Sequence, residues 1–284
     1  MRDSSERWAA AHLTEEPVPE LPRGADISRS SASRVYDYGL GGSHNFEVDR
    51  RVLDEIKKIF PATPQPARDN RAFLGRAVRH CQRRGIRQFL DLGSGIPTVG
   101  NVHEIAQRGD PLARVVYVDI DPVAVACGRA LLRGRERTRV LQADMRRPRS
   151  VLDHPETREL LDFAEPVAVL MVAMTHYLAD EDDPAGVLAA YHRVMSPGSF
   201  LVFSHMTADD HPEVHRTVEA FNAGSSDRLV LRSREEIAAL LAGFEFVEPG
   251  LVHPAAWRPD GPLAAGHDPS LAACYAGVAA PIPG

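Results

Sequence analysis

Residues 87–95 read RQFLDLGSG, and residues 114–121 read RVVYVDID. Each is a short apolar run that ends in an acidic residue, and the first leads directly into a glycine-rich turn. Further apolar runs at 139–144, 166–174 and 199–206 alternate with segments of helical spacing. Continuous apolar strands joined by helices are typical of a parallel sheet covered on both faces. The pattern therefore predicts an α/β fold built on a parallel sheet.

The rest of this region predicts how the sheet is completed. Helices are expected at 101–107, 122–134, 154–161, 184–195, 210–223 and 233–242. Strands are expected near 244–252 and 273–279, with a long proline- and glycine-rich connection between them. Such a connection suits an antiparallel pair of terminal strands. We therefore expect seven strands, mostly parallel, with an antiparallel C-terminal hairpin.

The N-terminal part of the chain predicts two further segments. Residues 1–28 are polar and carry three closely spaced prolines, which is typical of a tail that is disordered or draped on the surface. Residues 29–84 carry helical apolar spacing from 46 to 60 and again from 66 to 84. We expect this segment to form a helical extension, or lid, on a ligand-binding domain of residues 85–284.

Composition excludes several classes of protein. The 284 residues carry a formal net charge of −6, and no apolar run is long enough to span a membrane. The N-terminus lacks the apolar core of a signal peptide, so a cytoplasmic location is expected. The three cysteines form no CxxC pair, which indicates a reduced compartment. An acidic chain is also not expected to coat nucleic acid. The sequence leaves the oligomeric state open.

The turn after the first strand predicts a ligand site. Gly93 and Gly95 let a ligand approach the backbone closely. A dinucleotide fingerprint would place a third glycine where this chain has Thr98. Asp91 precedes the turn, and an anionic side chain there is a poor neighbour for a pyrophosphate. It suits a ligand that carries an ammonium group.

Two more acids follow the next two strands. Asp119 ends the second strand and is placed to accept hydrogen bonds from both hydroxyls of a ribose. Asp144 ends the third strand and is placed to accept a hydrogen bond from an adenine amino group. Ile120 and Met145 are expected to cover the adenine ring. Each acid alone is a weak signal. Three acids at the ends of three successive strands, together with the DxGxG pattern, are a much more specific one.

This constellation resembles the class I S-adenosylmethionine-dependent methyltransferases, and the resemblance implies a Rossmann-like α/β fold. The runs at 34–50, 68–79 and 86–107 look like one branch of them, the S-adenosyl methyltransferase family that is abundant in actinomycetes. The resemblance implies S-adenosylmethionine as cofactor and a substrate that the family name does not define. The implied cofactor contacts are Tyr36, Asp91, Gly93, Ser94, Gly95, Asp119, Ile120, Asp144, Met145 and Ala173. The family loop often reads DIGTG where this chain has DLGSG, a change that conserves size and hydroxyl.

Methyl transfer from a sulfonium needs in-line positioning, and a base only when the acceptor must lose a proton. His176, after the fourth strand, is the best-placed candidate base, with a structural loop histidine as the alternative. Tyr36 is a second candidate catalytic residue that lines the methionine pocket or covers the substrate, with packing of the N-terminal helices as the alternative. The expected partner is a small-molecule substrate.

The sequence is also compatible with two other functions. One is a non-catalytic protein that binds S-adenosylmethionine for regulation, and another is a nicotinamide-dependent oxidoreductase, against which Asp91 counts. His211 and His215 have the spacing of helical zinc ligands, but no cysteine or HExxH pattern supports them, so no metal site is expected. The acidic run at 180–183 is explained as the start of a helix, and the arginine-rich segment 68–87 as a solvated helix face.

Overall fold

The computed structural model of the chain describes Pro22, residues 25–97 and residues 100–282. Most of the predicted tail at 1–28 lies outside the described residues, and so does Thr98.

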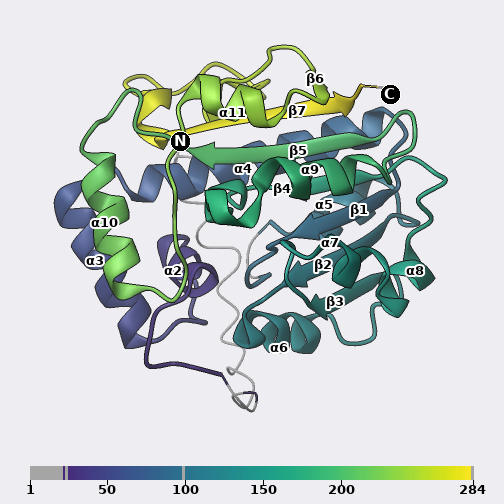
Figure 1. Cartoon of the computed structure of the whole chain (residues 1–284), viewed down its shortest axis with the longest axis horizontal. Helices are drawn as coiled ribbons and strands as arrows, with labels where there is room; N and C mark the ends of the chain where they lie inside the picture. Colours follow the sequence, from purple (N-terminus) through teal and green to yellow (C-terminus); the bar gives the residue numbers. More distant parts are fainter. Residues whose placement is uncertain (1–21, 23–24, 98–99, 283–284) are drawn as a thin grey trace, which may run out of the picture.

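One seven-stranded sheet forms the centre of the molecule (Figure 1). Its strands are β1 (Gln88–Leu92), β2 (Arg114–Asp119), β3 (Thr138–Gln142), β4 (Ala168–Met171), β5 (Phe200–Met206), β6 (Phe244–Phe246) and β7 (Cys274–Pro281). They lie in the order β3-β2-β1-β4-β5-β7-β6. The first five strands are parallel, whereas β7 runs antiparallel to both β5 and β6. The predicted mostly parallel sheet with an antiparallel C-terminal pair is confirmed.

Helices connect and cover these strands. The α-helices are α2 (Ala32–Gly39), α3 (Glu47–Ile59), α4 (Pro64–Arg83), α5 (Val102–Gly109), α6 (Pro122–Leu131), α7 (Pro148–Leu152), α8 (Pro155–Leu160), α9 (Pro184–His192), α10 (Val214–Gly224) and α11 (Arg234–Leu240). Short 3₁₀ helices lie at Thr175–Tyr177, Asp180–Asp182, Pro254–Ala256 and Pro269–Ala272. No helix within the described ranges combines the length and the apolar character that crossing a membrane requires.

The strands bury alternate side chains on the two faces of the sheet, as pleating requires. Leu90 and Val116 face one apolar cluster with residues of α7, α8, α9 and α11. Phe89 and Val115 face the opposite cluster, which contains residues of α4, α5 and α6 and the fully buried Trp257. Both faces are therefore covered, which explains why the strand sequences are continuously apolar.

The N-terminal helices pack in two different places. Phe73, Ala77 and Cys81 of α4 belong to the sheet cluster that includes Trp257. Helices α2 and α3 instead pack with α10, through an apolar cluster that includes Leu53 and Phe221. Figure 1 shows α2, α3 and α10 together beyond the carboxyl ends of the parallel strands. This group of helices therefore lies over the edge of the sheet at which Asp91, Asp119 and Asp144 were predicted.

Three elements differ from the expectation. Helix α2 lies within the expected helical extension at 29–84 but outside its two predicted helices, because eight residues are too few to establish a helical period. Helix α7 was not expected, and it precedes α8, which lies within the predicted helix at 154–161. Strand β6 has only three residues, and beyond it the chain keeps isolated contacts with β7, such as the bridge between Val252 and Ala276. A cis peptide bond precedes Pro249, within this departure from regular pairing.

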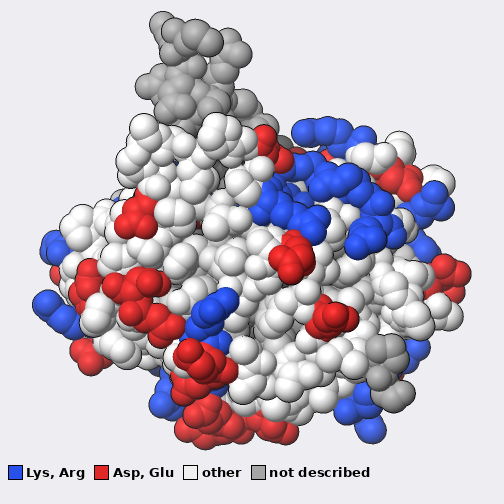
Figure 2. All heavy atoms as spheres, turned by 90° about the horizontal axis from the view of Figure 1, so that it is seen from above, with Lys and Arg blue, Asp and Glu red and all other residues white. Residues whose placement is uncertain are grey.

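The charged surface is mixed in sign. Figure 2 shows basic side chains gathered in one area of the viewed face and acidic side chains in others. In the arginine-rich segment 68–87, Arg79 forms an ion pair with Asp260, and Arg87 forms one with Asp110. These pairs agree with the interpretation of a solvated face at Arg79 and Arg87. Arg76 contradicts it, because this side chain is buried and donates to the backbone carbonyls of Pro254 and Trp257.

Candidate functional site

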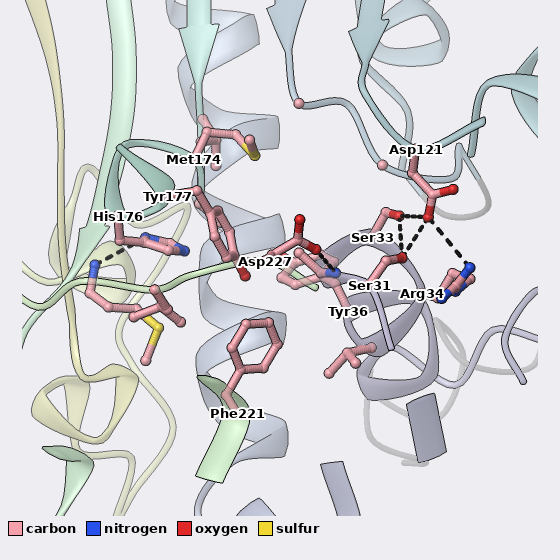
Figure 3. Close-up of a pocket in the computed structure, with 18 of the residues that line it drawn as sticks. Ser31, Ser33, Arg34, Tyr36, Asp121, Met174, His176, Tyr177, Phe221 and Asp227 are labelled. Carbon is pink, nitrogen blue, oxygen red and sulfur yellow. Dashed lines mark hydrogen bonds and ion pairs between the residues drawn. The ribbon is translucent and has the colours of Figure 1, made fainter. Parts of the chain in front are cut away.

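A cavity of about 700 Å³ opens where the parallel strands end and α2, α3 and α10 cover them (Figure 3). Every candidate site residue from the sequence lies in its lining. These residues are Tyr36, Asp91, Gly93, Ser94, Gly95, Asp119, Ile120, Asp144, Met145, Ala173 and His176. The strand register explains this, since Leu92 pairs with Val118 and Asp119 pairs with Gln142, so the strand ends reach one edge of the sheet.

The glycine-rich turn is held against the second strand. The N–H groups of Gly93 and Ser94 both donate to the Val118 carbonyl, and the Gly95 N–H donates to the Asp119 carboxylate at 2.7 Å. Gly93 has φ +72° and Gly95 has φ +64°, a region that other residues rarely adopt. A Cβ on Gly93 would also collide with the Met174 side chain. The turn therefore requires glycine for its conformation and for close approach.

Asp91 and Asp119 are two neighbouring buried carboxyls at this edge. Burial raises the pKa of Asp91 to about 7, and it raises that of Asp119 to about 6. Asp119 accepts hydrogen bonds from the N–H groups of Gly95 and Asp121, which act in the opposite direction. Among the described residues, the Asp91 carboxyl has no hydrogen-bond or ion-pair partner, although its backbone pairs with both neighbouring strands. A buried acid without a partner at the lining of a cavity indicates a ligand that supplies one.

Arg71 of α4 lies on the same side of the cavity. Its guanidinium lies over the ring of Tyr36, 5.6 Å from the centroid, and its charge acts to lower the pKa of Asp91. The Arg71 Nε atom is buried without a hydrogen-bond partner. Asp91 and Arg71 therefore offer one negative and one positive group, each with unused hydrogen-bonding capacity.

Asp144 and its neighbours form the far end of the cavity. Arg146 donates to both carboxylate oxygens of Asp144, with its Nε at 2.9 Å from Oδ1 and its Nη2 at 2.9 Å from Oδ2. These hydrogen bonds lower the pKa of Asp144 despite its partial burial. Met145 is buried, whereas Ile120 is 49% exposed and lies at the mouth. Asp144 is thus an ionised acid with an arginine partner.

Asp121 joins the N-terminal helix to the sheet (Figure 3). Its Oδ2 atom accepts hydrogen bonds from the hydroxyls of Ser31, at 2.5 Å, and Ser33, at 2.9 Å. Arg34 lies 3.9 Å from the same oxygen. The other oxygen, Oδ1, accepts from the Val123 N–H and caps α6. One carboxylate therefore fastens the lid segment directly beside the strand end that carries Asp119.

A chain of hydrogen bonds holds the centre of the cavity wall. The Ala173 N–H donates to the Ser204 hydroxyl at 2.7 Å, and this hydroxyl donates to the Asn70 side-chain oxygen at 2.7 Å. The Tyr36 hydroxyl donates to the Ala67 carbonyl at 3.2 Å. Ala173 has φ +58°, so the backbone after β4 is fixed in a conformation unusual for alanine. The hydrogen bond to the Ala67 carbonyl of α4 therefore fixes the Tyr36 ring at the cavity wall.

His176 lies in a buried setting that makes a base role difficult. Its Nδ1 atom accepts a hydrogen bond from the Met206 N–H at 3.3 Å, so the neutral ring carries its proton on Nε2. Burial, with His205 and Arg232 nearby, holds the pKa of His176 well below its usual value. This arrangement favours a neutral hydrogen-bond donor, and it gives no support to the prediction that His176 is a base.

Several residues of the site were not identified from the sequence. They are Ser31, Ser33, Arg34, Arg71, Asp121, Tyr177, Phe221 and Asp227. Two of them carried a sequence signal, because Asp121 follows Asp119 by two residues at a strand end and Tyr177 directly follows His176. The others lie on helices or loops whose local patterns show only packing. Among the residues that the structure describes, no group of three His, Cys, Asp or Glu side chains is arranged to hold a metal ion.

Comparisons with known proteins relate the chain to methyltransferases. The model of a protein family described as S-adenosyl methyltransferase matches residues 19–281. A crystal structure of a proposed methyltransferase from Thermobifida fusca has 40% sequence identity and a TM-score of 0.86, covering 94% of this chain and 99% of that one. A protein of the DUF574 family from Streptomyces avermitilis has 39% identity and a TM-score of 0.86, covering 90% and 99%. A search of the curated proteins found no match.

Proposed function

The chain belongs to the S-adenosyl methyltransferase family, and from that premise we propose that it transfers the methyl group of S-adenosylmethionine to a small molecule. The observation that carries the cofactor assignment is the buried Asp91 carboxyl in the cavity, which has no partner among the described residues and has Asp119 and Arg71 nearby. S-adenosylmethionine supplies an activated methyl group on a positively charged sulfur. Its positive charges suit a cavity wall with two buried acids.

The residues of the cavity fit the parts of this cofactor. We assign Asp91 to the ammonium group of the methionine part and Arg71 to its carboxylate, because the two side chains offer opposite charges with unused hydrogen-bonding capacity. Asp119 is assigned to the ribose hydroxyls. The glycine-rich turn at 93–95 lets the cofactor lie against the backbone. Close approach and matched charges are what a site for a zwitterionic nucleoside requires.

The adenine end of the site is assigned to the residues that follow β3. Asp144 accepts the adenine amino group, and Met145 and Ile120 cover the ring. Ala173 lies after β4, where the wall is fixed by its hydrogen bond to Ser204. Tyr36 covers the site from the N-terminal segment. His176 lines the cavity and is not assigned as a base, because its Nδ1 atom already accepts from the Met206 N–H and burial holds its pKa well below the usual value.

The affinity for the cofactor is expected to depend on pH. Since burial raises the pKa of Asp91 to about 7, this carboxyl is partly protonated at neutral pH and must lose its proton to bind a cation. The affinity should therefore fall as the pH drops below about 7, approaching about tenfold per pH unit for one proton. Asp91→Asn should bind more weakly and give a flatter profile. Calorimetry from about pH 5.5 to 8 measures both; a wild-type profile as flat as that of the variant would contradict the assignment.

Calorimetric titration with S-adenosylmethionine and with NAD tests the proposed function directly. We expect S-adenosylmethionine to bind with a stoichiometry near one and NAD not to bind, because Asp91 would face the pyrophosphate. Binding of NAD without S-adenosylmethionine would favour the oxidoreductase instead. A crystal structure with S-adenosylhomocysteine separates an enzyme from a regulatory binder. An open space beside the sulfur is expected for the enzyme, and a sealed one would indicate the regulatory protein.

A further inference from the structure

The cavity extends beyond the residues assigned to the cofactor, and the chemistry of this second compartment points to one kind of acceptor. On the basis of the function proposed above, we infer that the methyl acceptor is an apolar molecule that carries an amine. The carboxylate of Asp227 holds the amine, and the rings of Tyr36, Tyr177 and Phe221 surround it. Neither the family nor the cofactor assignment requires this substrate class.

The walls of this compartment are apolar and come from elements far apart in the sequence. They are Leu53, Ile56, Phe60, Val214, Val218, Leu229 and Ala273. The same side chains form the cluster that joins α3 to α10, so the compartment lies within that cluster and not on the sheet. An acceptor with an apolar body would replace water along these walls, which is favourable.

Asp227 is the acidic side chain that borders this compartment. Its Oδ2 atom accepts a hydrogen bond from the Ala32 N–H at 2.7 Å, at the start of α2. Within the described part of the chain, no basic side chain forms an ion pair with it, and its Oδ1 atom has no hydrogen-bond partner. Burial and the nearby Asp121 raise its pKa, whereas Arg34 and Arg146 act to lower it. A cation placed at Oδ1 would offset the desolvation of this carboxylate.

Aromatic rings surround the same space. Figure 3 shows Asp227 and the rings of Tyr36, Tyr177 and Phe221 facing one part of the cavity. Tyr177 and Phe221 lie with their centroids 6.2 Å apart and their planes tilted by 52°. Aromatic faces beside a carboxylate are an arrangement that recognises ammonium groups, because each ring attracts a cation through its quadrupole.

The arginines in the cavity lining disfavour an acidic acceptor. Arg34 pairs with Asp49, Arg146 with Asp144, and Arg228 with Glu181. The fourth, Arg71, lies over Tyr36 and is assigned to the carboxylate of the cofactor. Within the described lining, Arg228 is the basic side chain left to meet a carboxylate or phosphate of the acceptor, and it is 70% exposed, so solvent and salt screen its charge. The charge of the compartment is therefore complementary to a cation.

The chemistry of the step follows from this arrangement. The ammonium of the bound acceptor gives one proton to the Asp227 carboxylate, which frees the lone pair on nitrogen. The nitrogen forms a bond to the methyl carbon as the sulfur–methyl bond breaks, and the electron pair of that bond stays on sulfur. The product is a methylated ammonium, and the proton on Asp227 passes to solvent. Asp227 thus both binds the acceptor and removes its proton.

Three probes with the same ring and different head groups test the substrate class. They are 2-phenylethylamine, 2-phenylethanol and 3-phenylpropionate, titrated by calorimetry into protein saturated with S-adenosylhomocysteine. We expect the amine to bind at least about tenfold more tightly than the alcohol, and the carboxylate to bind most weakly. Asp227→Asn keeps an oxygen for the Ala32 N–H and should remove the preference for the amine. Asp260→Asn, on the surface, loses the same charge and should leave the preference unchanged.

Two results would overturn the inference. One is a preference for the alcohol or the carboxylate, or no binding of the amine. The other is an Asp227→Asn variant that still prefers the amine. Affinity for S-adenosylhomocysteine, measured first, separates this failure from a failure of the proposed function. A protein that binds S-adenosylhomocysteine but prefers the wrong probe contradicts only the substrate class. A protein that does not bind it contradicts the proposed function itself.

Discussion

Replacing Arg34 by methionine is expected to lower the free energy of unfolding by about 3–5 kcal/mol, the range for removing one partner of a buried ion pair. Arg34 is 2% exposed, and its Nε lies 3.1 Å from the carboxylate of Asp49, which is fully buried. Methionine would fill much of the space but would leave the Asp49 charge without a cation. The same change would also remove the contact of Arg34 with Asp121, which fastens the lid. Chemical denaturation, followed by circular dichroism, measures the loss.

Arg51→Met provides the matched control. Arg51 pairs with Glu47 on the same helix, but both side chains are highly exposed. An exposed pair contributes only about 0–1 kcal/mol, so this variant should unfold almost like the wild type. A loss for Arg34→Met that is no larger than the loss for Arg51→Met would show that the lid is not held by its buried ion pair.

Replacing Asp119 by alanine is expected to weaken the binding of S-adenosylmethionine by about 1–3 kcal/mol, or roughly 5- to 150-fold. The variant removes the carboxylate assigned to the ribose hydroxyls. It also frees the N–H groups of Gly95 and Asp121, which Asp119 holds at 2.7 and 2.9 Å. The glycine-rich turn therefore loses both a ligand contact and an internal support. Calorimetric titration of the variant gives the change in affinity.

The thermal unfolding of the ligand-free variant must be measured beside this titration. Asp119 is buried near Asp121 and Asp227, and these neighbouring charges act to raise its pKa. Its removal also relieves repulsion, so the ligand-free protein should stay folded. Asp260→Ala serves as the surface control for the lost charge. A folded Asp119→Ala protein with wild-type affinity would remove Asp119 from the cofactor site.

The fold and the row of acids at one edge of the sheet were accessible from the sequence for the same physical reason. A strand buried on both faces must be apolar throughout, so it shows in the sequence, and so do the polar residues directly after it. Parallel strands end at one edge, so Asp91, Asp119 and Asp144 had to lie near one another. The elements that the sequence did not predict correctly are those whose local pattern is weak. Helix α7 has five residues, and β6 has three, too few for either period to show.

Helix α2 shows why the cover of the cavity could not be predicted from the sequence. Its first N–H group is satisfied by Asp227, which lies 195 residues later in the sequence. Its Arg34 is neutralised by Asp49 on the next helix, and its serines bind Asp121 across 90 and 88 residues. None of these contacts follows from helical or strand periodicity, because each joins segments that only the folded sheet and its covering helices bring together.

The sequence by itself determined the parallel sheet, the glycine-rich turn and the row of acids, since local burial and strand direction fix all three. Only the tertiary structure decided what faces those acids. It brought α2, α3 and α10 over the strand ends, and it left the Asp91 carboxyl without a partner among the described residues. It also placed the Met206 N–H against His176 Nδ1, which makes the Nε2–H of His176 a hydrogen-bond donor. The physical reason is that a long-range contact depends on how whole elements pack together. The periodicity of a segment shows which of its residues are buried, but it does not show which other segment covers them.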